Sequence, residues 1–289
     1  MNDITKADRA KGMWLAERPW VALPVFLVAL VFMLFLVGAV FAAAGLQPGG
    51  PLQSFVANLL LLFVVTPFLL GLPRGRKGLV PYLDDIRLTR IRPLVALVLL
   101  GISLWVILAL CQGLGTIIFR LTEGKALSWA FLAGVWNLGT ALPPHSDSLW
   151  MSLPPVLEEP VFRGVLITLF LTRYRRNWSI VIPAIAFGAI HLLNMTGGQD
   201  PLWVLGQTGW AFLMGLAYGY VFIKANSLLP GMILHYLGNL FVGSIMAYLN
   251  ANGSIETQVL YGVLTTFGLV PVVLMILWVK TFSRRWLGK

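Results

Sequence analysis

Charged residues are scarce in this sequence. They make up 11 % of the 289 residues, whereas about a quarter of a typical soluble domain is charged. Hydrophobic residues account for 58 %, and the mean hydropathy is +0.84. This composition excludes an ordinary soluble domain and predicts an all-α polytopic membrane protein. We expect one integral membrane domain, residues 1–289.

Cysteine is nearly absent, and no internal repeat of the kind found in many transporters is visible. The only cysteine, Cys111, lies in an apolar run and excludes an intramolecular disulfide framework. We therefore interpret Cys111 as a packed core residue. Small residues recur in Gly215–Gly219, a spacing that allows close contact between helices.

Apolar runs of about 20 residues, the length that crosses a bilayer, predict eight transmembrane helices. They are Trp20–Ala44, Phe55–Leu72, Leu94–Phe119, Leu149–Leu171, Trp178–Leu193, Leu202–Ile223, Leu228–Leu249 and Val259–Val279. Residues 127–138 are apolar but short. Whether they span the membrane, re-enter it or lie in the interface stays open.

Basic residues account for the net charge of +10. Nearly all of the 21 lysines and arginines fall in segments on one side of the predicted membrane. This distribution follows the positive-inside rule, with both termini in the cytoplasm. The charge thus indicates topology and contact with the lipid bilayer, and nucleic acid is not an expected partner. We expect a multi-pass protein of the plasma (inner) membrane of a prokaryote; its oligomeric state stays open.

Acidic residues are the rarest charged type, yet two adjacent ones lie inside an apolar stretch. Only 11 acids occur in the chain, and Glu158 and Glu159 are two of them. Ionisable groups in hydrocarbon are costly, so such a pair predicts a functional site. Arg163 follows Glu159 at the i, i+4 spacing that places both on one helical face. Glu158 points about 100° away from Glu159.

Histidine is also rare, and two of the three histidines fall in predicted spans. His191 follows Phe187 at an i, i+4 spacing, and His235 precedes Asn239 at the same spacing, which places each pair on one helical face. Counted along the predicted helices, Glu158 and His191 lie at a similar depth, roughly 20 Å from the cytoplasmic side. Each group alone is compatible with a structural role. Their coincidence in a chain that otherwise avoids such groups favours a shared site.

Two kinds of hydrolytic chemistry fit these residue types. A carboxylate and a histidine converging on water form a general base, while a second histidine and an amide can stabilise an oxyanion. Alternatively, Glu158, His191 and His235 supply the two histidines and one glutamate of a catalytic zinc site. Both alternatives predict amide hydrolysis. The HExxH arrangement of zincins is absent from the sequence.

Three motifs in this order resemble those of the CPBP family, which comprises CAAX proteases (type II CAAX prenyl endopeptidases) and bacteriocin-processing enzymes and is also called the ABI family. The motifs are Glu158-Glu159-x-x-x-Arg163, Phe187-x-x-x-His191 and His235-x-x-x-Asn239. The resemblance covers about Pro155–Leu249, and we assign residues 145–250 as the motif-bearing catalytic core.

The resemblance implies an eight-helix intramembrane endopeptidase with a conical polar cavity. It assigns activation of water to Glu158 and His191, with or without zinc, and stabilisation of the oxyanion to His235 and Asn239. Supporting roles go to three further residues, Glu159, Arg163 and Phe187. The implied substrate is a membrane-associated protein or peptide, and whether it is prenylated stays open, as does its entry route.

Two non-proteolytic alternatives remain at this point. The same fold could serve as a non-catalytic membrane scaffold or bacteriocin-immunity protein, although such a protein has little reason to keep costly buried charges. A proton-coupled transporter, with Glu158, Glu159 and Arg163 as a relay, is disfavoured by the absence of repeats.

Overall fold

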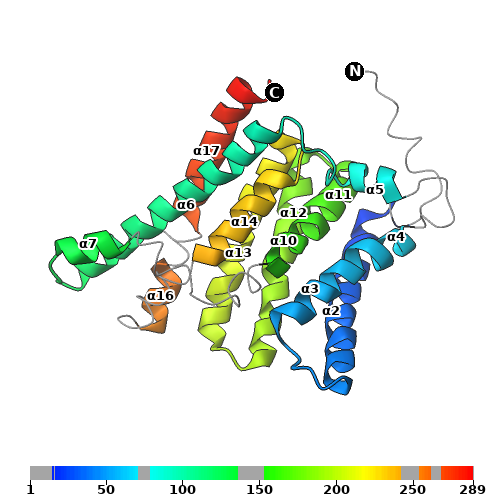
Figure 1. The fold of residues 1–289 in the computed structure, drawn as a ribbon, viewed down its shortest axis with the longest axis horizontal. Helices are drawn as coiled ribbons and strands as arrows, with labels where there is room; N and C mark the ends of the chain where they lie inside the picture. The colour runs from blue at the N-terminus through cyan, green and yellow to red at the C-terminus, as the bar shows by residue number, and fades with distance from the viewer. Residues whose placement is uncertain are drawn as a thin grey trace.

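The computed structural model describes residues 15, 17–70, 79–135, 153–241, 254–261 and 268–288. These residues form helices joined by turns, and no strand occurs among them (Figure 1). The all-α prediction is therefore confirmed for the described part of the chain.

The N-terminal part is a helical hairpin. Helix α2 (Pro19–Ala43) packs against α3 (Pro51–Leu60), which continues through the π-helix η1 (Leu61–Val65) into α4 (Thr66–Leu69). The side chain of Gln53 donates from Nε2 to the carbonyl of Leu34, 2.8 Å away. This bond joins the two arms of the hairpin within an otherwise apolar contact.

The next segment contains the short helix α5 (Leu79–Asp85), the long helix α6 (Leu94–Thr122) and the short helix α7 (Trp129–Val135). Cys111 is buried and unpaired in α6, as expected for a core residue. Trp129 of α7 is 87 % exposed. Helix α7 covers about 10 Å at 1.5 Å per residue, too little to cross a bilayer on its own. Residues 136–138 of the predicted 127–138 stretch lie outside the described residues.

The C-terminal half contains the motif-bearing elements. They are α10 (Leu153–Glu159), the π-helix η3 (Pro160–Ile167), α11 (Thr168–Leu171), α12 (Arg176–Ile190), the 3₁₀ helix η4 (His191–Gly197), α13 (Pro201–Ala225) and α14 (Leu229–Phe241). Helix α14 packs against α6 and α10, and α13 packs against α12. After α16 (Ile255–Tyr261), helix α17 (Leu269–Trp286) packs on α6 and α13.

Glycines bring α12 and α13 close together. A Cβ built on Gly188 would lie 2.8 Å from the carbonyl oxygen of Thr208, and one on Gly215 would lie 3.0 Å from Cβ of Ala184. A Cβ on Gly219 would similarly lie 2.8 Å from a side-chain atom of α12. The sequence prediction of close helix contact at Gly215–Gly219 is confirmed, and the backbone of α12 is held against the helix that follows it.

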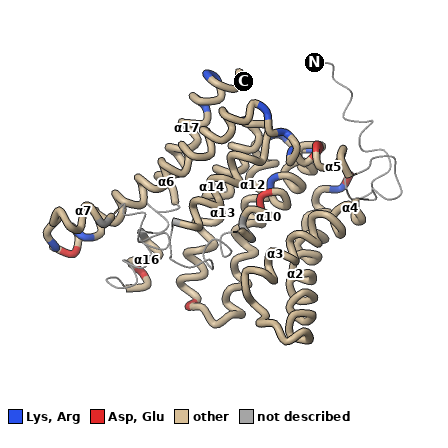
Figure 2. Tube along the Cα trace, in the orientation of Figure 1, with Lys and Arg blue, Asp and Glu red and all other residues tan. Residues whose placement is uncertain are grey.

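Four helical segments in the described ranges are long and apolar enough to cross a membrane: Pro19–Ala43, Pro51–Leu69, Leu94–Thr122 and Arg176–Gly197. Figure 2 shows most Lys and Arg near the edge of the molecule where α17 ends and α5 lies. The number of eight spans and the cytoplasmic placement of both termini stay predictions. Parts of four predicted spans (71–72, 149–152, 242–249 and 262–267) lie outside the described residues.

Candidate active site

The helix that carries the two glutamates changes its geometry directly after them. Glu159 ends α10, and Pro160 begins the π-helix η3. Proline has no backbone N–H, so it cannot donate to the carbonyl four residues earlier. A π-helix uses i→i+5 hydrogen bonds instead, and such segments are frequent at functional sites. The sequence therefore widens the helix at the site.

The wider turn places Glu159 and Gly164, which are five residues apart, on the same side of the helix, toward α14. A Cβ built on Gly231 of α14 would lie 3.4 Å from Oε2 of Glu159. A Cβ built on Gly164 would lie 3.3 Å from Cδ1 of Leu228, next to the start of α14. In a regular α-helix, residues five apart would differ by about 140° at 100° per residue. The π-helix thus turns both residues toward the N-terminal part of α14.

Glu159 is the centre of the buried polar contacts. Its Oε1 accepts a hydrogen bond from Nδ1 of His235 at 2.8 Å and lies 3.3 Å from Nη1 of Arg163. The Glu159 side chain is 1 % exposed and that of Arg163 is 2 % exposed. The predicted pair of Glu159 and Arg163 is confirmed. The contact with His235 joins α10 to α14 and was not predicted.

The guanidinium of Arg163 lies between aromatic rings. Its Cζ is 4.1 Å from the ring centroid of Phe187 and 4.9 Å from that of Tyr218. Such cation–π contacts are strongest where water is excluded. Among the described residues, Nη1 and Nη2 of Arg163 have no hydrogen-bond acceptor. Glu159 and the rings of Phe187 and Tyr218, with that of Phe162 further away at 6.0 Å, thus compensate this buried cation.

The two histidines each have one ring nitrogen engaged. His191 is half-buried, and its Nδ1 lies 2.8 Å from the carbonyl oxygen of Phe187. A carbonyl oxygen only accepts, so Nδ1 carries the proton, and in the neutral ring Nε2 has a lone pair. His235 donates its Nδ1–H to Glu159 in the same way. Among the described residues, neither Nε2 has a hydrogen-bond partner, so both atoms are candidates for chemistry.

Phe187 lies between these groups. Its ring centroid is 5.1 Å from that of His191 and 6.0 Å from that of His235, both edge to face. The same ring covers Arg163. The assignment of Phe187 as a supporting residue thus fits its position, because it contacts all three.

Tyr218 was not identified as a site residue from the sequence. Its ring lies on that of His235, with centroids 5.0 Å apart and planes inclined by 24°. It also interacts electrostatically with Glu158, Glu159 and Arg163. The residue belongs to the small-residue stretch Gly215–Gly219, whose pattern indicates helix packing. The available signal was a tyrosine within a predicted span, because a tyrosine hydroxyl needs a polar partner when it is buried.

The remaining predicted residues lie at the border of this cluster. Glu158 is half-buried and interacts electrostatically with Tyr218. Asn239 is on α14, one turn beyond His235, and its side chain is exposed. The structure thus brings together Glu159, Arg163, Phe187, His191 and His235 through direct contacts. It does not place Asn239 inside that group.

Comparison with protein families matches residues 148–241 to the model described as type II CAAX prenyl endopeptidase Rce1-like. This match supports the expected resemblance to the CPBP family over that stretch. No curated protein and no solved structure gives a significant match. The Rce1-like stretch covers about a third of the chain and includes every motif residue from Glu158 to Asn239. The family implies a protease, and with the four apolar helices it indicates an integral membrane protein.

The side chains that could hold a metal ion are His, Cys, Asp and Glu. Among the residues that the structure describes, no group of three or more His, Cys, Asp or Glu side chains is placed to hold a metal ion. The two Nε2 atoms are suitable donors for zinc, but Glu158, His191 and His235 do not form a set of three ligands in this arrangement. Zinc stays a prediction that the arrangement of donors among the described residues does not support.

Proposed function

We propose that this protein is an intramembrane endopeptidase that hydrolyses a peptide bond of a membrane-associated protein or peptide. The observation that carries the proposal is the meeting of His191 and His235 around Phe187, each with Nδ1 hydrogen-bonded and with no hydrogen bond from Nε2 to another described residue. Two imidazoles beside a buried carboxylate can move protons within a water-poor site.

In the proposed reaction, Glu158 and Nε2 of His191 both bind one water molecule, and this pair together takes up the single proton that the water loses. The resulting hydroxide attacks the scissile carbonyl carbon, and the carbonyl π electrons move to oxygen. When this tetrahedral intermediate collapses, the C–N bond breaks and the accepted proton passes to the leaving nitrogen. General acid–base catalysis of this kind contributes about 10²- to 10⁴-fold to a rate.

His235 and Asn239 are proposed to stabilise the oxyanion. His235 donates from Nε2 only when both ring nitrogens carry protons, and a carboxylate at Nδ1 stabilises an imidazolium. Glu159 occupies that position, 2.8 Å from Nδ1. Asn239 joins this role only if its exposed amide faces the bound substrate. Glu159 and Arg163 support the site by holding the ring of His235.

The substrate class is the finer part of the proposal. A CaaX-type prenylated peptide is one possible substrate, since the matching family is that of type II CAAX prenyl endopeptidases.

A location in the inner membrane of a prokaryote also stays a prediction.

The test is a cleavage assay on detergent-purified protein with a quenched farnesylated peptide and its non-prenylated counterpart. Glu158→Ala and His191→Ala are expected to abolish cleavage, with helix content unchanged. Glu256→Gln, at an exposed site in α16, is the matched control and should cleave like wild type.

Metal content measured on the same samples distinguishes the two chemistries. Cleavage without stoichiometric metal would support the glutamate–histidine mechanism, whereas zinc lost together with activity would establish the metalloprotease. Folded wild type that cleaves neither peptide would contradict the proposal and favour the scaffold or immunity protein. Substrate-dependent proton flux in proteoliposomes would favour the transporter.

A further inference from the structure

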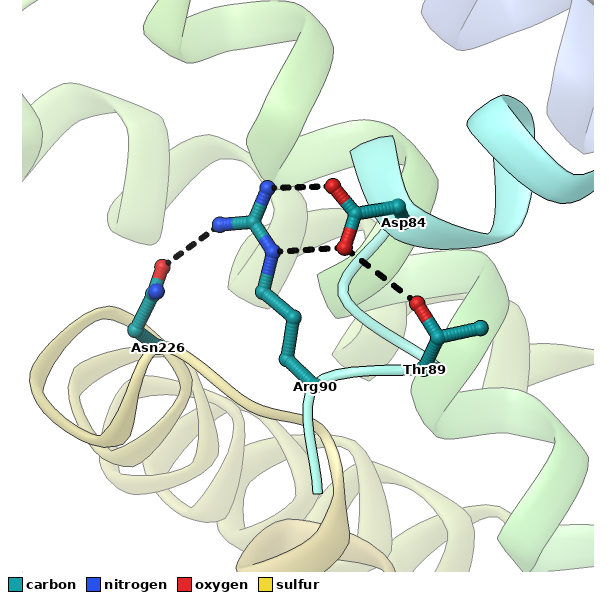
Figure 3. Close-up of polar contacts among 4 residues, drawn as sticks. All are labelled: Asp84, Thr89, Arg90 and Asn226. Carbon is teal, nitrogen blue, oxygen red and sulfur yellow. Dashed lines mark hydrogen bonds and ion pairs between the residues drawn. The ribbon is translucent and has the colours of Figure 1, made fainter. Parts of the chain in front are cut away.

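The loop between the second and third apolar helices contains a dense set of polar contacts. Figure 3 shows Arg90 between two partners. Its Nε and Nη2 donate to the two carboxylate oxygens of Asp84, at 3.1 and 3.0 Å, and Thr89 donates to Asp84 at 3.2 Å. A two-point bond between a guanidinium and a carboxylate fixes the direction of both groups. We call residues 79–93 the clamp.

The clamp is attached to the turn between α13 and α14. Nη1 of Arg90 donates to Oδ1 of Asn226 at 3.0 Å. Nη1 of Arg87 donates to the carbonyl of Phe222 at 3.2 Å, with Cζ 4.3 Å from the Phe222 ring centroid. Cations at the C-terminal end of a helix are also favoured by its dipole. Asn226, with φ 57°, is the residue at which α13 ends.

The clamp is equally attached to the helix that carries the glutamates. Ile86 is buried, and a Cβ built on Gly164 of η3 would lie 3.1 Å from its Cβ and from its carbonyl oxygen. Tyr82 of α5 donates to the carbonyl of Leu62 in η1 at 2.9 Å. One short segment therefore contacts η1, η3 and the turn between α13 and α14 at once.

These attachment points lie close in sequence to the ends of the Glu159–His235 hydrogen bond. Gly164 follows Glu159 within the same continuous helix, and the turn at Asn226 leads directly into α14 and His235. Helices transmit a displacement of one end along their length. A hydrogen bond of 2.8 Å tolerates only a few tenths of an ångström before it weakens.

We propose that the clamp positions His235 against Glu159, and that the Arg90–Asn226 hydrogen bond is the contact through which it does so. Arg90 and Asn226 are positioning residues, since neither contacts the groups of the candidate active site. The activity readout of this inference rests on the proposed function. The structural readout does not.

The test compares two substitutions at one position in the full-length protein. Asn226→Gly removes the side-chain acceptor and keeps a residue that adopts positive φ readily. Asn226→Asp keeps an oxygen acceptor for Arg90. Thr89→Val is the control, because it removes one bond inside the clamp and leaves the bond to Asn226 in place.

Hydrogen–deuterium exchange in proteoliposomes is the structural readout. Asn226→Gly is expected to raise exchange in peptides covering 160–171 and 229–241 together, whereas Asn226→Asp and Thr89→Val leave both at wild-type values. A change confined to the turn around Asn226, or no change, would overturn the inference whether or not the protein is a protease.

Cleavage kinetics are the functional readout. Displacement of a catalytic group by about 1 Å can cost about 100-fold in rate, so a partial displacement in Asn226→Gly is expected to lower kcat about tenfold with KM unchanged. Asn226→Asp should restore most of kcat. An equal loss in both variants, or a change in KM alone, would contradict a positioning role. Wild type without activity would count against the proposed function, and the exchange result would then decide this inference alone.

Discussion

Removing the charge of Glu159 tests whether this carboxylate stabilises the buried cation of Arg163. Glu159→Gln keeps the shape of the side chain but leaves Arg163 as a buried cation without its counter-ion. At 3.3 Å between Nη1 and Oε1, the Coulomb attraction is roughly 5 kcal/mol at an effective dielectric constant of about 20. Removing one partner of a buried ion pair typically destabilises a protein by about 3–5 kcal/mol. We expect Glu159→Gln to fall in that range.

A double variant that also removes the cation of Arg163 completes a double-mutant cycle. Replacing both partners of a buried pair by uncharged groups of similar volume is often neutral. The double variant Glu159→Gln/Arg163→Met is therefore expected to lie within about 1–2 kcal/mol of wild type. Arg163→Met alone should cost less than Glu159→Gln, because His235 still donates to the carboxylate.

The assay is equilibrium unfolding in mixed micelles with increasing denaturing detergent, followed by helix content. Glu256→Gln, an exposed substitution, is the control and should leave stability close to that of wild type. If the double variant were as unstable as the sum of the two single variants, Arg163 would not be held by Glu159, and the reasoning would be wrong. Cleavage should stay low even where stability returns, because the carboxylate that orients His235 is missing.

Three further predictions concern packing and charge. Gly188→Ala should destabilise the protein by about 1–3 kcal/mol through overpacking, because the new Cβ would lie 2.8 Å from a backbone carbonyl oxygen of α13. Gly197→Ala is the control, since its new Cβ has no neighbour within 4 Å among the described residues, and thermal unfolding measures both variants. Tyr218→Leu should cost about 1–2 kcal/mol by removing the ring from the buried guanidinium, while Tyr218→Phe should stay close to wild type in the same measurement. The hydroxyl of Ser254 lowers the pKa of Glu256 below its ordinary value. The contact therefore stabilises α16 above pH 4.5, and this stabilisation is lost as the pH falls through the lowered pKa. Ser254→Ala should raise the pKa of Glu256 in a titration followed by NMR.

Local spacing predicted part of the site correctly. The i, i+4 relation of Glu159 and Arg163 needs only a helical turn, and the structure confirms that pair. The apolar runs also predicted helices well, as α2 (Pro19–Ala43) against the expected Trp20–Ala44 shows. These predictions hold because they depend on neighbours along the chain.

The contacts between helices could not be predicted in the same way. The hydrogen bond from His235 to Glu159 joins residues 76 positions apart, and which carboxylate faces α14 depends on the π-helix that begins at Pro160. A prediction based on α-helical geometry therefore assigned Glu159 only to Arg163. Likewise, Asn239 shares a helical face with His235 by spacing, but its side chain is exposed. The involvement of Tyr218 depends on contacts from α13 to His235 on α14 and to Arg163 on η3.

The π-helix Pro160–Ile167 also restricts which sequence changes this segment can accept, both in engineered variants and in evolution. A deletion of one residue between Pro160 and Gly164 would let the segment return to regular α-helical hydrogen bonding, which is locally more favourable. The same deletion would rotate the glutamate pair relative to everything that follows it, so Ile86 and Gly231 could no longer both meet their present partners. Natural variants of this segment should therefore tolerate exchange of side chains far better than a change in its length.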